Sequence, residues 1–235
     1  MDIIRDERRI KVFSSIGQYA TLGGLLILLV GLVISFVEPS WIVPLMASMA
    51  LGFILSVVGG FFADRYAGSL AHHKALADVL KGLDYRHKLL QYVLPANHVL
   101  LEPGGCTVFV VKSQGGEVVY EDGEDGRWKH RQRGRFFRRL VGQEGVGKPH
   151  VEAQLQVRKL RRYLADRMDD ADQVPLRAAV VFVNEDVELR AHDSPVPAFY
   201  RKNVKDWLRG PESLRALSDG LRQRLEGALI AEGLS

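Results

Sequence analysis

Residues 19–37 read YATLGGLLILLVGLVISFV, and residues 41–62 read WIVPLMASMALGFILSVVGGFF. Neither stretch contains a charged residue. Each is long enough to cross a bilayer as a helix, since about 20 residues rising about 1.5 Å each span a hydrocarbon core of about 30 Å. Only Glu38, Pro39 and Ser40 separate the two stretches. The sequence therefore predicts a transmembrane helical hairpin over residues 19–62, with antiparallel helices at 19–37 and 41–62.

Small residues in both stretches would allow the two helix backbones to approach closely. We expect this contact to be made by Gly23, Gly24, Gly31, Ala47, Ala50 and Gly52. A hairpin of this kind is also a candidate surface for association between copies of the chain.

The charges that flank the hairpin predict its orientation. The short loop carries only Glu38, whereas the two outer flanks carry Arg5, Arg8, Arg9, Lys11, Arg65 and Lys74. Because positively charged flanks stay on the cytosolic side, we expect both termini and the soluble part to be cytosolic at the cell membrane. Residues 1–18 are then a cytosolic N-terminal segment.

The rest of the chain has the composition of a charged soluble protein. The whole sequence is 47% hydrophobic with a net charge of +4, and its longest uncharged apolar stretches lie in the predicted hairpin. Its one cysteine, Cys106, cannot form an intramolecular disulfide, which is typical of a reducing compartment. We expect Cys106 to be a packed core thiol.

Hydrophobic periodicity predicts an α/β domain over residues 63–210, followed by a C-terminal amphipathic helix over residues 211–235. A first helix carries apolar residues at 76, 79, 80 and 83 and ends near Pro95. We expect His72 and His73, at its start, to face solvent or the membrane interface. Three strands follow at residues 98–101, 107–112 and 117–120. A second helix is expected at residues 151–164 and a fourth strand at residues 176–183. The predicted order is αβββαβ.

One run of sequence carries a family resemblance. Residues 97–112 read NHVLLEPGGCTVFVVK and are followed by Gly115 and Gly116, then by Trp128 and by a helix start at Pro149 to Gln154. In this order the features resemble the nuclease-related domain (NERD) family, a branch of the PD-(D/E)xK restriction-endonuclease-like fold. The resemblance covers residues 74–208 and implies a restriction-endonuclease-like domain.

The resemblance also implies a catalytic pattern that this sequence departs from. Nucleases of this kind hold Mg²⁺ with carboxylates, because a hard cation prefers oxygen ligands, and use a neighbouring lysine for charge stabilisation. Lys112 matches the family lysine, but Asn97 and Val110 stand where the family has acids. Glu102 and Glu117 lie close in sequence and are the candidate substitutes. We therefore assign no catalytic residue, metal ligand or cofactor, with Mg²⁺ required only if these displaced carboxylates are active.

A basic cluster follows the third predicted strand and is interleaved with aromatic residues. Its cations are Arg127, Lys129, Arg131, Arg133, Arg135, Arg138 and Arg139. Such a cluster suits a nucleic-acid backbone with bases to stack, and it equally suits anionic lipid headgroups at the inner leaflet. A solvated loop whose charges maintain solubility is the third interpretation.

Together these features predict a membrane-anchored cytosolic domain, degenerate as a nuclease, that binds an anionic partner, either lipid headgroups or nucleic acid. One alternative is an active Mg²⁺-dependent DNA nuclease with displaced carboxylates. The other is a structural membrane assembly protein whose hairpin oligomerises.

Overall fold

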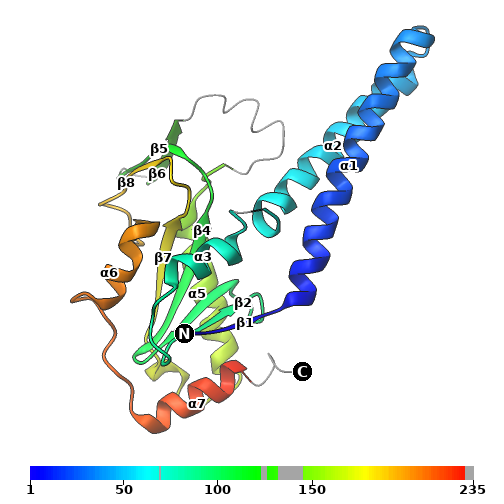
Figure 1. The fold of residues 1–235 in the computed structure, drawn as a ribbon. Helices are drawn as coiled ribbons and strands as arrows, with labels where there is room; N and C mark the ends of the chain where they lie inside the picture. Colours follow the sequence, from blue (N-terminus) through cyan, green and yellow to red (C-terminus); the bar gives the residue numbers. More distant parts are fainter. Residues whose placement is uncertain (69, 123–125, 132–144, 231–235) are drawn as a thin grey trace. The chain divides into compact units, whose positions relative to one another are not determined.

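The computed structural model describes residues 1–68, 70–122, 126–131 and 145–230. These residues divide into two compact units, which are described separately (Figure 1). The hairpin unit contains residues 8–71. The sheet unit contains residues 1–7, 72–131 and 146–230.

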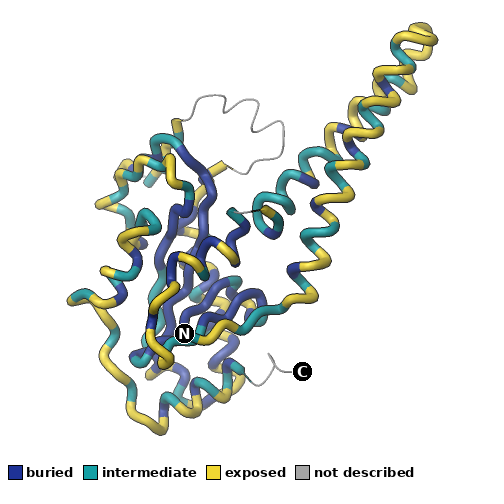
Figure 2. Tube along the Cα trace, viewed as in Figure 1, coloured by how far each residue is buried: buried dark blue, intermediate teal, exposed yellow. Residues whose placement is uncertain are grey.

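The hairpin unit consists of two long apolar helices, α1 (Glu7–Val37) and α2 (Ile42–Tyr66). Their most apolar windows have mean hydropathies of 2.6 and 2.2, and only 11% of each window is buried. Helices of a soluble core would be mostly buried, whereas most residues of this pair are exposed or half-buried (Figure 2). The exposed ones include many large apolar residues. The lengths and composition are those of membrane-spanning helices, and both helices extend beyond the predicted limits of residues 19 and 62.

Glycines at seven-residue spacing line the contact between α1 and α2. A Cβ on Gly24 would lie 3.0 Å from the carbonyl oxygen of Gly52, and a Cβ on Gly59 would lie 3.0 Å from that of Gly17. Larger residues would therefore push the helices apart. The prediction was correct for Gly24, Gly31 and Gly52. It was wrong for Gly23, beside which a Cβ would meet nothing within 4 Å, and for Ala47 and Ala50, which are exposed.

The sheet unit contains a mixed six-stranded sheet in the order β1-β2-β3-β4-β7-β9. Pairing is antiparallel for β2 with β3 and for β3 with β4, and parallel for β1 with β2, β4 with β7 and β7 with β9. The strands are β1 (Asp2–Arg5), β2 (Lys88–Gln91), β3 (His98–Glu102), β4 (Gly105–Lys112), β7 (Leu176–Phe182) and β9 (Ala198–Tyr200).

A second sheet has three strands in the order β6-β5-β8. Its strands are β5 (Gly116–Glu121), β6 (Arg127–Arg131) and β8 (Val187–Arg190). The pair β5 and β6 is antiparallel, whereas β5 and β8 are parallel. Val118 of β5 joins a core cluster with Val110 of β4 and Phe182 of β7, so the two sheets share part of one core.

Helices cover the large sheet on both faces (Figure 1). On one face, α5 (Pro149–Ala165) and α7 (Asp219–Ile230) bury Leu160, Leu164 and Leu225 against strand residues such as Val99 and Val108. Alternate strand residues point to the opposite face, where α3 (His72–Leu80) packs against β4 and α6 (Val204–Arg209) packs against α3. Short 3₁₀ turns, Ala171–Gln173 and Arg201–Asn203, complete the described elements.

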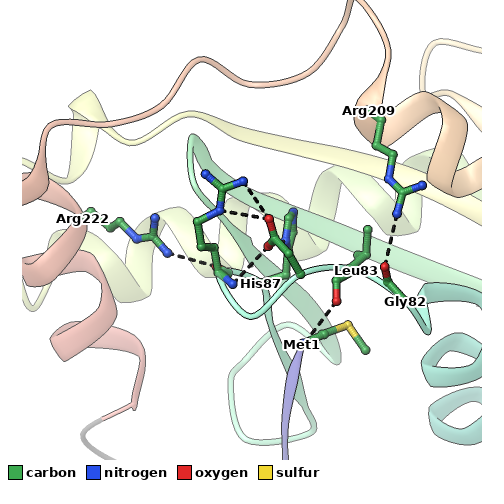
Figure 3. A network of polar contacts seen from close by, with 8 residues as sticks. Met1, Gly82, Leu83, His87, Arg209 and Arg222 are labelled. Carbon is green, nitrogen blue, oxygen red and sulfur yellow. Dashed lines mark hydrogen bonds and ion pairs between the residues drawn. The ribbon is translucent and has the colours of Figure 1, made fainter.

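The connection between α3 and β2 holds three distant segments together through its backbone carbonyls (Figure 3). The carbonyl of Leu83 accepts from the Met1 ammonium at 3.2 Å, and that of Gly82 accepts from Arg209 at 3.3 Å. The carbonyl of Arg86 accepts from Arg222 at 3.0 Å. These bonds fasten β1, α6 and α7 to one loop.

The structure confirms a mixed α/β domain after two apolar helices, and it corrects several limits. Where one helix was predicted to reach Pro95, α3 ends at Leu80 and β2 follows. The last helix begins at Asp219 rather than at residue 211. Residues 1–18 are not a separate segment, because residues 2–5 form a strand of the sheet and α1 begins at Glu7. His72 and His73 were predicted to face solvent or the interface, but both are buried.

Candidate functional site

Lys112 ends β4 with its side chain inside the protein. The side chain is 5% exposed, and its ammonium lies 3.0 Å from Oε2 of Glu152. Glu152 is in the first turn of α5, which crosses this face of the sheet. A buried ammonium needs an anionic partner, and Glu152 is the partner that this helix supplies.

The other oxygen of Glu152 continues the polar network. Nε2 of Gln156, one turn further along α5, lies 3.4 Å from Oε1 of Glu152. Oε1 of Gln156 accepts a hydrogen bond of 3.0 Å from the backbone N–H of Asn97. Through two residues of α5, the structure therefore links Lys112 to the backbone of Asn97. The resemblance had placed both residues at positions of the family's catalytic pattern.

The donors around Lys112 do not fit a magnesium ion. Glu152 is the one carboxylate in this network, and the lysine already engages it. Val110, at the position of a family acid, is 2% exposed and packs in the core with Ala153. Within the described part of the chain, no group of three or more His, Cys, Asp or Glu side chains could hold a metal ion. Because Mg²⁺ prefers several anionic or carbonyl oxygens, we derive no metal-dependent step from this network.

Glu102, one candidate substitute for the missing acids, lies at the other end of β4. Glu102 pairs with Gly105, the first residue of β4, and Lys112 is the last residue of the same strand. Seven residues of extended strand separate Gly105 from Lys112, a distance of about 23 Å. Its carboxylate accepts from the hydroxyl of Thr107 and from Arg177, the latter at 2.9 Å. Glu102 therefore neutralises Arg177, whose side chain is 14% exposed, and it is too distant to share an ion with Lys112.

Glu117, the other candidate substitute, belongs to the second sheet. Its carboxylate lies 3.7 Å from the guanidinium of Arg190 on β8. Val118 beside it points into the core cluster that contains Val110. Because successive side chains of a strand point to opposite faces, Glu117 faces away from that core.

Trp128 and His150 fix the beginning of α5. Nε1 of Trp128 donates a 2.9 Å hydrogen bond to Nδ1 of His150, so this imidazole is neutral with its proton on Nε2. Burial, together with nearby Lys148, lowers the pKa of His150 and favours the same state. Tyr120 and Phe182 pack on the indole at ring centroid distances of 5.3 and 5.9 Å. This cluster holds the helix turn that presents Glu152.

The described part of the basic cluster forms one strand with alternating side chains. Arg127, Lys129 and Arg131 are the exposed residues of β6, while Trp128 and His130 between them are half-buried. On this face the neighbouring strands bring both signs of charge, and Lys129 lies 2.7 Å from Glu121. The cluster's remaining cations, Arg133, Arg135, Arg138 and Arg139, lie outside the described residues.

Glu152 is the site residue that the sequence analysis missed. It is neither in a strand nor close in sequence to Lys112, and 40 positions separate the two. The available signal was its position in the first turn of a helix whose buried face includes Ala153 and Gln156. That signal indicates a residue near the core boundary, but it does not identify the strand residue opposite.

Comparison with protein families assigns the domain that contains this network. Residues 67–183 match the model of the nuclease-related domain family, and this range includes β2 to β7 with the Lys112 and Glu152 network. Comparisons with curated proteins and with solved structures returned no match. The chain therefore carries a nuclease-related domain (NERD) at residues 67–183, beside two helices that are long and apolar enough to cross a membrane.

Proposed function

We propose that this chain is a membrane-anchored nuclease-related domain that binds an anionic partner and does not cleave it. The observation that carries the proposal is the closed pair of Lys112 and Glu152. In a metal-dependent nuclease the lysine stands beside metal-bound carboxylates and stabilises developing charge. Here the ammonium neutralises a single carboxylate, so neither group is available for that chemistry.

Sheet pairing supports the proposed topology. β1 precedes α1 in the chain, and β2 follows α2, yet the two strands pair in parallel from Asp2 with Lys88 to Arg5 with Gln91. This pairing supports a hairpin whose two ends lie on the same side of a membrane. The positive flanks favour the cytosolic side.

The exposed cations of β6 support an anionic partner of modest affinity. On their face of the small sheet, Arg190 adds to the three cations, while Glu117, Glu121 and Glu188 oppose them. The formal sum over these seven residues is +1. Attraction to phosphates there is electrostatic and should weaken as salt rises.

A cleavage assay tests the catalytic half of the proposal. The full chain in detergent is incubated with single- and double-stranded DNA and with Mg²⁺ or Mn²⁺, beside the Lys112→Ala variant. We expect no metal-dependent cleavage by either protein. Cleavage that disappears in Lys112→Ala would contradict the proposal, and Glu152 would then be the first carboxylate to substitute.

A binding assay tests the other half. The full chain is reconstituted in nanodiscs of neutral lipid, and oligonucleotide binding is measured at low and high salt. Lipid binding is followed through quenching of tryptophan fluorescence by anionic lipids with labelled headgroups. Neutralising Arg131, Arg133 and Arg135 together should weaken whichever interaction is present. If neither ligand binds at low salt, the cluster is a solvated surface.

The hairpin contact bears on the assembly-protein alternative. The close approaches at Gly17, Gly24, Gly52 and Gly59 are all made between α1 and α2 of one chain. The small residues are therefore already used inside the hairpin, and their presence does not by itself favour association between copies.

A further inference from the structure

The edge of β7 is paired along only part of its length. β4 pairs with β7 from Leu176 to Phe182, but on the other side β9 pairs only with Val180 to Phe182. The backbone N–H of Val180 donates to Pro197 of the β9 segment at 2.9 Å. In a strand, alternate residues direct their backbone groups to the same side. The N–H and C=O of Ala178 therefore point to the same side as those of Val180, where no described strand pairs with them.

Two prolines explain why β9 extends no further. Pro195 and Pro197 lie in the segment that would continue the pairing toward Ala178. Proline lacks a backbone N–H, so a segment containing it cannot form a regular ladder. β9 therefore begins only at Ala198, and on this side no described strand pairs with β7 before Val180.

A groove of about 550 Å³ follows this open edge. Its floor is formed by Leu176 to Ala178, and one wall is the segment from Pro195 to Pro197. The opposite walls are formed by Gln154, Val157 and Arg158 of α5, by Trp207 of α6 and by Glu212, whose carboxylate accepts from the Trp207 indole. The groove is thus a slot with unpaired backbone groups along its floor and apolar side chains on both sides.

The walls of the slot are fixed by contacts of their own. The guanidinium of Arg177 stacks on the indole of Trp207 at 4.0 Å and donates to the Glu212 carbonyl at 2.7 Å. The indole N–H donates to the Glu212 carboxylate at 2.8 Å, and Phe199 packs on the ring at 5.0 Å. A rigid wall lowers the entropy cost of binding.

Charge and exposed apolar surface on α5 identify the kind of ligand. Arg158 is an exposed cation at the rim, and Arg162 lies four residues further on the same face. Val151 and Leu155, on the adjoining part of this face, are 43% and 47% exposed. An extended segment with alternating apolar and acidic residues would complement the cations, the apolar surface and the unpaired backbone together.

We propose that this slot, defined by the β7 edge at Leu176 to Ala178, binds an extended acidic and apolar peptide segment of a partner protein by strand addition. The partner's backbone pairs with the free groups of Ala178, which gives affinity that is independent of sequence. Its acidic side chain pairs with Arg158, which gives selectivity. The proposal is independent of the nuclease-related function, because the slot and the Lys112 network use different residues.

The test uses defined peptides and the full chain in detergent. The probe is a fluorescein-labelled peptide, acetyl-Glu-Val-Thr-Val-Glu-Val-amide, and its binding is measured by fluorescence anisotropy. A second peptide has lysine in place of both glutamates. Two further peptides carry N-methyl groups on alternate backbone nitrogens, one peptide for each of the two registers. The variants are Arg158→Glu and, as a matched control, Lys159→Glu, which makes the same charge change at an exposed position about 100° around the helix.

We expect the acidic peptide to bind the parent chain, and Arg158→Glu to weaken that binding about tenfold while improving binding of the lysine peptide. Lys159→Glu should leave both affinities within about twofold, and N-methylation in one register should abolish binding because it removes backbone donors. Equal losses in both variants would show diffuse electrostatics and overturn the proposal. Undiminished binding of both N-methylated registers, absence of binding, or self-association of the chain through this edge would also overturn it.

Discussion

Substituting the two partners of the Lys112 and Glu152 pair one at a time should have unequal effects on stability. Glu152→Gln leaves a lysine whose side chain is 5% exposed without an anion, because the other described contacts of this network are neutral. Lys112→Met removes the buried charge and retains a long apolar side chain. The remaining Glu152 is 33% exposed and can be hydrated. The glutamate substitution should therefore be the more damaging one.

The size of the effect follows from the geometry. Unit charges 3.0 Å apart attract by about 5 kcal/mol at an effective dielectric constant of about 20. Solvent at the partly exposed Glu152 screens much of this, and glutamine keeps a carbonyl acceptor. We expect Glu152→Gln to lower the free energy of unfolding by about 1–3 kcal/mol, and Lys112→Met by less than about 1 kcal/mol. The double variant should resemble Lys112→Met, since the unpaired charge is then absent.

Thermal unfolding of the full chain in detergent, followed by tryptophan fluorescence, measures the difference. Each kcal/mol corresponds to roughly 2–4 °C in Tm for a domain of this size. The matched control is the Lys129 and Glu121 pair, with a shorter separation of 2.7 Å but with side chains that are 58% and 51% exposed. Lys129→Met and Glu121→Gln should both shift Tm by little. If Lys112→Met lowers Tm as much as Glu152→Gln does, an unpaired ammonium at position 112 is not what destabilises the Glu152→Gln variant. That result would refute the predicted inequality.

Three further predictions concern the contact between the hairpin helices, the buried His73 and the orientation of the chain in the membrane. Gly24→Leu should separate the hairpin helices and lower yield and Tm, whereas Gly23→Leu, whose Cβ meets nothing within 4 Å, should have little effect; equal effects would place the contact elsewhere. Burial and the nearby cations lower the pKa of His73 from 6.5 to about 4, so the unfolded chain binds the proton more readily. Folding stability should then fall by about 3 kcal/mol as pH drops from 6.5 to 4, and the slope of Tm against pH should flatten in His73→Leu; an unchanged slope would assign it to other groups. In intact cells a membrane-impermeant thiol reagent should label Glu38→Cys but not Tyr85→Cys, which lies at an 80% exposed position; labelling of Tyr85→Cys before permeabilisation would refute the cytosolic assignment.

The parts of the fold that were predictable from sequence are those specified by local patterns. The two uncharged stretches and the strands at residues 98–101, 107–112 and 117–120 each carry their own periodicity and are bounded by strong turn residues. The structure has helices or strands at all of them. The helix after Pro149 was also predictable, because proline at the first turn and apolar spacing agree.

The missing strands depend on distant partners. β1 is only four residues, DIIR, and two of these are charged, so nothing local distinguishes it from the flank of a membrane helix. It becomes a strand because β2 offers an edge 86 residues later, and Arg5 then donates to Gln91 at 2.7 Å. β6 was hidden in the same way, because a strand with three exposed cations resembles a solvated loop until its pairing with β5 is known.

The site residues on the strands were selected from the order of turns and strands, and their role stays a prediction. The structure links Lys112 through Glu152 and Gln156 to the backbone N–H of Asn97. The partner of Lys112 could not be selected in this way, since it depends on how α5 crosses β4. Reasoning from sequence proximity selected Glu102 instead, although the antiparallel register puts it at the opposite end of β4.

The pairing of β1 with β2 also constrains how the chain can fold. β1 precedes the two hairpin helices in the chain and its partner β2 follows them, so this edge of the sheet cannot be completed until the whole hairpin has been synthesised. β1 adjoins the start of α1, and β2 follows the end of α2. If these two helix ends lay on opposite sides of the membrane, a bilayer about 30 Å thick would separate β1 from β2. If the hairpin spans the membrane as proposed, pairing of β1 with β2 favours insertion with both outer ends of the hairpin on the same side. A chain that lacks β1 keeps both apolar helices but lacks the strand pairing that favours this orientation. It also exposes the edge of β2, whose Leu89 and Leu90 are fully buried in the complete sheet.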